Sequence, residues 1–294
     1  MRKFRTILWR SLVVTLVYTL ASTVIGGLVL HSAEGMAPPA NPALLLATTF
    51  ISGFLIGVTL GPLAARLHAS RLRSMMIYTT AVFLNMASVV IEGHFFAPGL
   101  LPLAVVPRMV VLHALIALVT GGTLSFLFPA QQPAGTVTAT RTSPSWAARF
   151  LFSAAAYLLF YYGFGAVNYA LVTGPYYEAH PTLLAVPQPG TVLMVASIRS
   201  AIIILSLLPL VLALRTSRRA GALWCGLTLF IIGGVLPLLM QAGLLPPLLL
   251  VASGVEIFFQ NFLAGAVAGL LLGQPKASPA SLHVVPVLAQ EEKV

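Results

Sequence analysis

Four charged side chains lie within otherwise apolar stretches of the sequence: Glu92, Arg108, Arg199 and Glu256. A charge inside the hydrocarbon of a membrane is costly, so such residues mark functional sites and usually have partners of opposite charge. If each stretch is a helix, Arg199 and Glu256 lie about 12 to 17 Å below the outer boundary of the membrane, and Glu92 and Arg108 about 6 to 10 Å below it. These depths predict two ion pairs, Arg199 with Glu256 and Arg108 with Glu92.

Such pairs suit two kinds of chemistry. Near the middle of a membrane, Glu256 can gain and lose a proton during a transport cycle, and Arg199 can bind an anion or a carboxylate. The structural alternative is an ion pair that fixes the register of two helices and does nothing else. The predicted site combines the charged residues with polar neighbours: Arg199, Glu256, Asn261, Asn168, Glu92, Arg108 and His113, with Gln260 also nearby in the sequence.

No cofactor or metal ion is expected. Three histidines, His31, His94 and His180, fall on the same predicted side, but they belong to separate segments and lack the short spacing of metal ligands. The sequence has no zinc helix of the His-Glu-x-x-His type, no Gly-x-Ser-x-Gly turn and no phosphate-binding loop. It also has no Asp, so aspartyl catalysis is excluded, and the chain is not expected to be an enzyme.

The elements that position these residues follow from composition. Hydrophobic residues make up 59% of the 294 residues and charged residues only 7%, whereas soluble proteins have about 25% charged residues. Runs of about 20 apolar residues are long enough to cross a bilayer as helices. The sequence therefore predicts an all-α integral membrane protein of eight transmembrane helices, over Ile7–Leu30, Ala43–Ala65, Met75–Phe96, Leu101–Phe128, Phe150–Val172, Thr191–Leu214, Leu223–Leu239 and Leu245–Leu272.

The positions of the cations predict the orientation. The segments before the first run and between runs two and three, four and five, and six and seven contain Lys or Arg, as does the tail. The alternate loops, 31–42, 97–100, 173–190 and 240–244, contain none. By the positive-inside rule, both termini are predicted to be cytoplasmic. The chain resembles small bacterial multispanning proteins in general, so we expect it in a bacterial plasma membrane.

The basic residues and the first apolar run each allow a second interpretation. The net charge of +10 is spread over short juxtamembrane loops, which favours anionic lipid headgroups over nucleic acid as the partner. The first run has a basic start like that of a cleaved signal peptide, but its apolar stretch of about 24 residues is longer than the 7 to 15 of such peptides. An uncleaved spanning helix is expected.

The two halves resemble each other weakly. At an offset of 144 residues, Gly99-Leu100-Leu101-Pro102 matches Gly243-Leu244-Leu245-Pro246 and Gly121 matches Gly265. At an offset of 147, Pro62-Leu63 matches Pro209-Leu210 and Leu67 matches Leu214. The pattern predicts two parallel repeats, 5–129 and 149–272, followed by a flexible cytoplasmic tail, 273–294. Chance similarity between apolar helices is the alternative.

Small residues indicate where helices approach closely. Gly53, Gly57 and Gly61 form two overlapping GxxxG spacings on one face of the second run. This face allows either self-association or, as we expect, ordinary tight packing.

Three functions remain open at this stage. The first is a small permease that binds a small solute near Arg199 and Glu256. The second is a noncatalytic membrane scaffold or accessory subunit, and the third is a membrane-embedded enzyme or haem carrier that uses His94, His113 or Glu256. A water-accessible cavity at Arg199, a closed dry bundle or two facing histidines would distinguish them.

Overall fold

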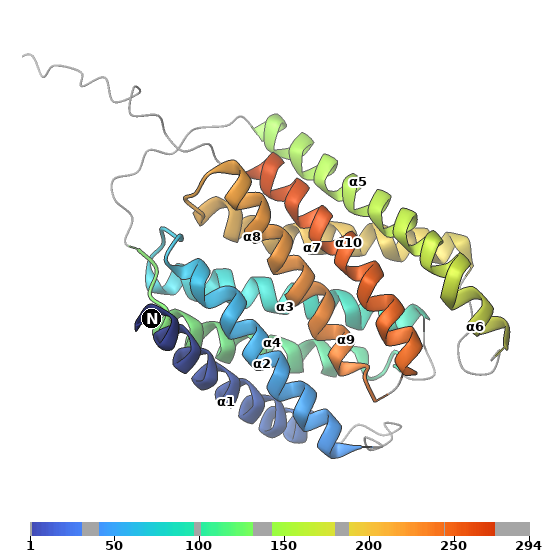
Figure 1. Ribbon diagram of the computed structural model, residues 1–294, viewed down its shortest axis with the longest axis horizontal. Coiled ribbons are helices and arrows are strands. Elements are labelled where there is room, and N and C mark those ends of the chain that lie inside the picture. The colour runs from blue at the N-terminus through green and yellow to red at the C-terminus, as the bar shows by residue number, and fades with distance from the viewer. Residues whose placement is uncertain are drawn as a thin grey trace, which may run out of the picture.

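The computed structural model describes residues 2–30, 41–96, 101–131, 143–179, 188–243 and 245–273, and these residues are mostly helical (Figure 1). The predicted tail therefore lies outside the described residues, except for Gly273. The elements are α1 (Arg2–Leu30), α2 (Pro42–Ala64), α3 (Arg71–Phe96), α4 (Val106–Leu127), α5 (Ser143–Asn168), η1 (Tyr169–Thr173), α6 (Gly174–Ala179), α7 (Pro189–Ala213), α8 (Arg218–Phe230), η2 (Ile231–Val235), α9 (Leu236–Met240) and α10 (Pro247–Leu272).

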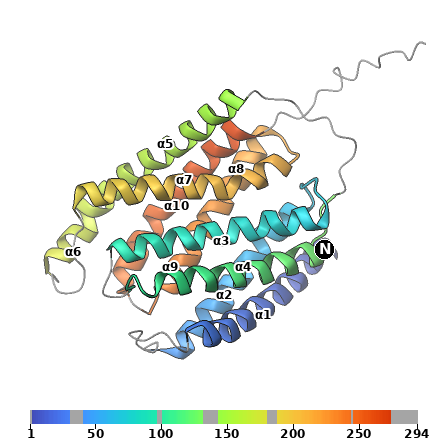
Figure 2. The same ribbon diagram turned by 180° about the vertical axis from the view of Figure 1, so that it is seen from behind.

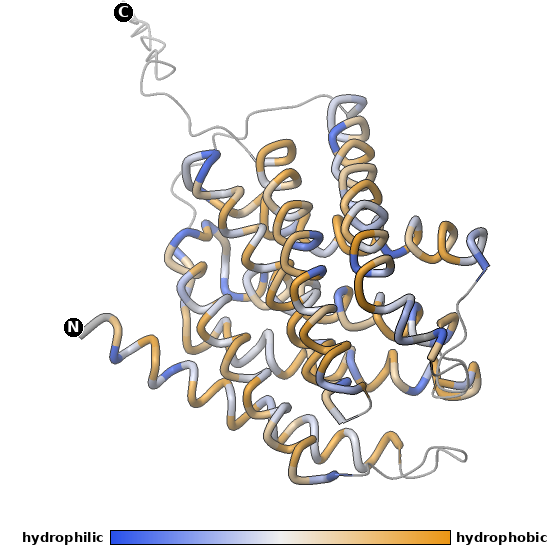
Figure 3. Tube along the Cα trace, turned by 45° about the vertical axis from the view of Figure 1, so that its right-hand side comes forward, coloured by the Kyte–Doolittle hydropathy of each residue, from blue (hydrophilic) through white to orange (hydrophobic). Residues whose placement is uncertain are grey.

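Within the described ranges, eight helices are long and apolar enough to cross a membrane, which is consistent with a multi-pass membrane protein. Six of them are single α-helices, whereas the fifth is α5 continued by η1 and α6, and the seventh joins α8, η2 and α9. Figure 3 shows hydrophobic residues along the helices and hydrophilic residues mainly near their ends. The eight predicted crossings are thus present as helices of suitable length.

The helix starts are explained by local sequence. The helices α2, α4, α7 and α10 each have a proline in their first turn, where the missing N–H costs nothing and the fixed φ suits a helix. The side chain of Asn41 also accepts a hydrogen bond from the Leu44 amide at 2.9 Å and so caps α2. We call the end of the bundle where these four helices begin the proline end, and the end with the loops 65–70 and 214–217 the arginine-rich end.

The helices form two layers with α1 and α5 at opposite edges. In Figure 1, α2, α8 and α10 lie in front of α4, α3 and α7, and Figure 2 shows the same arrangement from behind. The most extensive packing joins α8 with α10, α3 with α4, α1 with α2, α5 with α10 and α3 with α7. Only 17% of the α1 span and 11% of the fifth span are buried, against 39% or more elsewhere, so these two helices are peripheral.

The glycine face of α2 is used within the chain. A Cβ on Gly57 would lie 2.8 Å from the backbone of Ser11, and one on Gly53 would lie 2.9 Å from that of Thr15, so α1 packs directly on these positions. Gly61 is covered by the ring of Phe128. Within the described residues, tight packing against α1 and Phe128 covers all three glycines.

Two of the spans contain a π-helical turn, η1 in the fifth and η2 in the seventh. A π-turn inserts one residue into a helix and often occurs at functional sites. Neither turn is predicted from the sequence. Both lie beside polar side chains, as described below.

The loops at the arginine-rich end pair with each other. Leu67 and Leu214 form an isolated antiparallel bridge, in which the His68 amide donates to the Ala213 carbonyl at 3.0 Å and the Arg215 amide donates to the Arg66 carbonyl at 2.9 Å. Gln131 extends this contact, because its amide donates to the Leu67 carbonyl at 3.0 Å. Backbone hydrogen bonds thus join the two halves of the chain at this end.

Candidate functional site: a polar cluster between four helices

The cluster is built on helices that are neighbours in the fold. Glu92 lies one turn before the end of α3, Arg199 lies about 15 Å from the start of α7, and Glu256 lies about 14 Å from the start of α10. Asn168 is the last residue of α5, immediately before η1. All four therefore lie in the half of the bundle nearer the proline end.

Arg199 pairs with Glu92. Its Nη1 atom donates to Oε2 of Glu92, and their side chains are only 10% and 16% exposed. The hydroxyl of Tyr161 donates to the other oxygen of Glu92 at 3.4 Å. The carboxylate of Glu92 thus accepts from both α7 and α5, and the charge of Arg199 is balanced within the bundle.

Glu256 has a neutral donor. The amide Nδ2 of Asn168 donates to Oε2 of Glu256 at 2.5 Å, and Gly165 leaves room for this carboxylate, since a Cβ there would lie 3.3 Å from Oε1. The residue is half-buried between α10 and α5. Glu256 is thus hydrogen-bonded by a neutral side chain and takes no part in the Arg199–Glu92 pair.

Two further residues complete the cluster. Nε2 of Gln260 donates to the hydroxyl of Tyr157 at 2.7 Å, and the rings of Tyr157 and Tyr161 lie 6.2 Å apart on α5. Sequence reasoning missed both tyrosines. The sequence feature that could have indicated them is the spacing of Tyr157, Tyr161 and Asn168 at i, i+4 and i+11. This spacing places three polar side chains on one face of an otherwise apolar helix.

The predicted pairing of these charges is corrected. Glu92 takes Arg199, not Arg108, and Glu256 takes Asn168, not Arg199, as its hydrogen-bonding partner. Depth was an insufficient guide, because it does not say toward which neighbour a side chain lies: Glu92 of α3 contacts α7, and Glu256 of α10 contacts α5. In addition, α4 begins at Val106 rather than at Leu101, so Arg108 lies exposed in its first turn and not at the depth of Glu92.

The other predicted residues lie outside the cluster. His113 is buried in α4, which packs on α1 and α3 rather than on α7 or α10. Asn261 is fully buried in α10, where it faces α8. Among the described residues, no group of three or more His, Cys, Asp or Glu side chains is placed to hold a metal ion.

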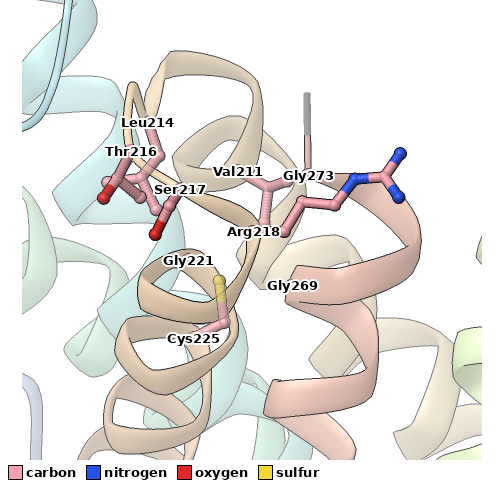
Figure 4. Close-up of a pocket in the computed structure, with 9 residues that line it drawn as sticks. All are labelled: Val211, Leu214, Thr216, Ser217, Arg218, Gly221, Cys225, Gly269 and Gly273. Carbon is pink, nitrogen blue, oxygen red and sulfur yellow. The ribbon is translucent and has the colours of Figure 1, made fainter. Parts of the chain in front are cut away.

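A shallow pocket lies at the arginine-rich end (Figure 4). It is lined in part by Leu214, Ser217, Gly221 and Cys225, and its volume of about 10 Å³ corresponds to roughly one water molecule. Figure 4 shows the Arg218 side chain extending away from the Cys225 thiol. Val211, which also lines it, is about 18 Å along α7 from Arg199, so this pocket does not open onto the polar cluster.

Comparison with known proteins gives no match, since no protein family, no curated protein and no solved structure is found to be similar to the chain. We therefore infer the function from the residues of the site.

Proposed function

We propose that the protein is a small permease in which Glu92, Arg199, Glu256, Asn168, Tyr157, Tyr161 and Gln260 form the solute site. The observation that carries this proposal is the gathering of three charged side chains from α3, α7 and α10 inside the membrane-spanning part of the bundle. Intramembrane charges are costly to keep, and a transport pathway is the usual reason for them. Asn168 and the two tyrosines supply the neutral hydrogen-bonding groups that such a site needs.

The charges favour a proton or a small cation over an anion as the bound species. Two carboxylates face one guanidinium, and the guanidinium of Arg199 is already engaged by Glu92. An anion near Arg199 would have to displace that carboxylate into a medium of low dielectric constant. Glu256, hydrogen-bonded by a neutral amide, is the group that exchanges a proton or a cation during the cycle.

We also propose that the chain consists of two parallel repeats, 5–129 and 149–272. The packing supports this, because each half has the same three contacts between helices. In the first half α1 packs on α2 and on α4, and α3 packs on α4; in the second half α5 packs on α7 and on α10, and α8 packs on α10. At the offset of 147 residues, His68 is equivalent to Arg215 and Ala213 to Arg66. The hydrogen bond from the His68 amide to the Ala213 carbonyl is therefore equivalent to the one from the Arg215 amide to the Arg66 carbonyl. Leu67 and Leu214 would then lie on either side of a pseudo-two-fold axis along the membrane normal.

The orientation with both termini in the cytoplasm completes the proposal. The arginine-rich end carries aromatic-stacked cations, such as Arg66 over the Trp224 ring at 4.9 Å and Arg71 over the Phe126 ring at 5.2 Å. Such residues suit the boundary with a cytoplasmic leaflet rich in anionic lipids. The polar cluster would then lie nearer the outer surface, and the paired loops would close the cytoplasmic side.

The proposal is tested by proton flux. Wild-type protein and the variants Glu256→Gln and Glu178→Gln are reconstituted at equal folded content into liposomes that contain a pH-sensitive dye, and an inward proton gradient is imposed. Glu178 is an exposed acid of α6 and serves as the control. We expect wild-type flux above that of empty liposomes, a loss of about tenfold or more in Glu256→Gln, and wild-type flux in Glu178→Gln, because only Glu256 belongs to the site.

Wild-type flux that persists in Glu256→Gln would contradict the role of this residue. No flux in the wild type, together with variants that are merely less stable, would favour the noncatalytic scaffold instead.

A further inference from the structure

The arginine-rich end of the bundle carries a strong positive charge. Its loops and helix ends contain Arg66, Arg71, Arg73, Arg149, Arg215, Arg218 and Arg219. The acids among the described residues, Glu92, Glu178 and Glu256, all lie toward the proline end. Within the described part of the chain, no carboxylate therefore balances the charge of the arginine-rich end, and this end is suited to an anion from outside the chain.

The pairing of the two loops brings two of these arginines together. The Arg215 amide donates to the Arg66 carbonyl at 2.9 Å, next to the bridge between Leu67 and Leu214. Like charges on facing residues of two paired segments destabilise the pairing. An anion bound between the guanidinium groups of Arg66 and Arg215 would remove this repulsion.

The guanidinium group of Arg66 is held in a fixed position. Its Nη1 atom donates to the Pro62 carbonyl, in the last turn of α2, at 3.0 Å, and its Cζ atom lies 4.9 Å from the centroid of the Trp224 ring on α8. The hydrogen bond uses one of the five N–H donors of the group. A side chain that is already ordered loses little conformational entropy when it binds a ligand, so Arg66 is prepared to bind an anion.

The two arginines lie where the phosphate groups of a bilayer are expected. Arg66 follows the end of the second membrane span by two residues, and Arg215 precedes the start of the seventh by three. The helices of these spans, α2 and α8, lie in the same layer of the bundle (Figure 1). Beside the half-buried Trp224, the side chain of Leu223 is 50% exposed and offers apolar surface to an acyl chain.

We propose that Arg66, Arg215 and Trp224 form a binding site for the headgroup of one anionic phospholipid, with its phosphate between the two guanidinium groups. Guanidinium groups bind phosphate oxygens through paired N–H donors, and basic sites at the cytoplasmic ends of membrane helices bind anionic headgroups. A free phosphate ion offers the same oxygens, but the apolar surface next to the arginines favours a lipid.

The bound lipid would also join the two halves of the chain. Arg66 belongs to the first half, and Arg215 and Trp224 belong to the second. The headgroup would therefore strengthen the contact that the paired loops make between the halves. This inference goes beyond the proposed permease and does not depend on it.

The test is the quenching of Trp224 fluorescence by brominated lipids. In a Trp9→Phe/Trp146→Phe background, Trp224 is the only tryptophan of the chain. This protein is reconstituted into phosphatidylcholine vesicles that contain a minor fraction of brominated phosphatidylglycerol or, in parallel, of brominated phosphatidylcholine. From the concentration dependence of quenching, we expect phosphatidylglycerol to bind next to Trp224 at least about fivefold more tightly than phosphatidylcholine, because cations near the surface attract anionic lipid.

Variants identify the residues that bind the headgroup. Arg66→Gln and Arg215→Gln each remove one cation of the site, and Arg73→Gln removes an exposed cation of α3 at the same end of the bundle. We expect the preference for phosphatidylglycerol to be lost in the first two variants and retained in the third. Arg215 is exposed, so Arg215→Gln decides the question should Arg66→Gln fail to fold.

Equal binding of the two brominated lipids in the Trp224-only protein would overturn the proposal. An equal loss of preference in all three variants would also overturn it, because the attraction would then be diffuse. Inorganic phosphate at constant ionic strength is the second probe, and we expect it to leave the quenching by brominated phosphatidylglycerol unchanged. Loss of that quenching would assign the site to a soluble phosphate instead of a lipid. None of these measurements involves transport, so a failure here is distinct from a failure of the proton-flux test.

Discussion

Arg199 and Glu92 come from positions 107 residues apart and from different halves of the chain. Hydropathy identified both residues as intramembrane charges, since each interrupts a long apolar run. It did not identify them as partners, because an ion pair depends on which helices pack together. The apolar pattern of a helix does not show which other helices are its neighbours. The same holds for Asn168 and Glu256. Both residues were predicted to belong to one site, but the hydrogen bond between them was not predicted.

The tyrosines and Asn85 were missed for a different reason. Tyrosine is common in membrane helices near the interface, so Tyr157 and Tyr161 did not stand out from their type alone. Asn85 is neutral, and it lies against a glycine of another helix, Gly233, which the sequence of α3 does not indicate. Residues that act through such a meeting of helices are found from the packing and not from composition.

The Arg199–Glu92 pair predicts a specific pattern of stabilities. Removal of one partner leaves an uncompensated buried charge and costs about 3 to 5 kcal/mol, whereas removal of both leaves none. We therefore expect Arg199→Leu and Glu92→Leu each to be strongly destabilised, and the double variant to be more stable than the sum of the two effects implies. Unfolding of the single and double variants in detergent, analysed as a double-mutant cycle, gives the coupling.

If the two single effects are additive within about 0.5 kcal/mol, the pair does not interact in the folded protein. The pairs of variants differ in charge only at these two positions, so the cycle needs no further control.

At the scale of the elements, run length and apolarity were sufficient to predict the eight crossings, because a backbone in lipid has to be helical and about 20 residues long. Helix starts were less accurate where an apolar loop precedes the helix, as with 101–105 before α4. The π-turns η1 and η2 could not be predicted, since each reflects one inserted residue that is accommodated by neighbouring helices.

The pairing of the two loops makes a prediction about chemical cross-linking. Leu67 and Leu214 face each other as a non-hydrogen-bonded antiparallel pair, for which the Cα atoms are typically about 4.5 Å apart, a separation that suits a disulfide. In a Cys225→Ala background, we expect Leu67→Cys/Leu214→Cys to form an intramolecular disulfide on mild oxidation. Loss of maleimide labelling after denaturation measures it.

The control carries Leu67→Cys with Thr216→Cys, two positions farther along the loop, and is expected to remain labelled. Equal labelling of the two double variants would mean that the loops do not meet as described, and the proposed pseudo-two-fold axis would lose its strongest support.

At the scale of the whole molecule, the proposed repeat and the site have different symmetries. Each half packs its helices in a corresponding order, but Glu92, Arg199 and Glu256 have no charged equivalents in the other half. The sequence indicates the proposed repeat only at a few glycines, prolines and loop residues, since most lipid-facing positions accept any apolar side chain. The arrangement of the two layers could not be predicted, because every helix has a similar apolar surface.

The central claim is that water and small solutes reach the polar cluster. Gly165→Cys, in a Cys225→Ala background, places a thiol where a Cβ lies 3.3 Å from Oε1 of Glu256. The fully buried Ile203→Cys of α7 is the matched control. Both are exposed to a charged, membrane-impermeant methanethiosulfonate reagent in right-side-out and inside-out vesicles. We predict labelling of Gly165→Cys, fastest from the side of the proline end, and none of Ile203→Cys. A Gly165→Cys thiol that is unreactive from both sides would show a closed, dry bundle and contradict the permease.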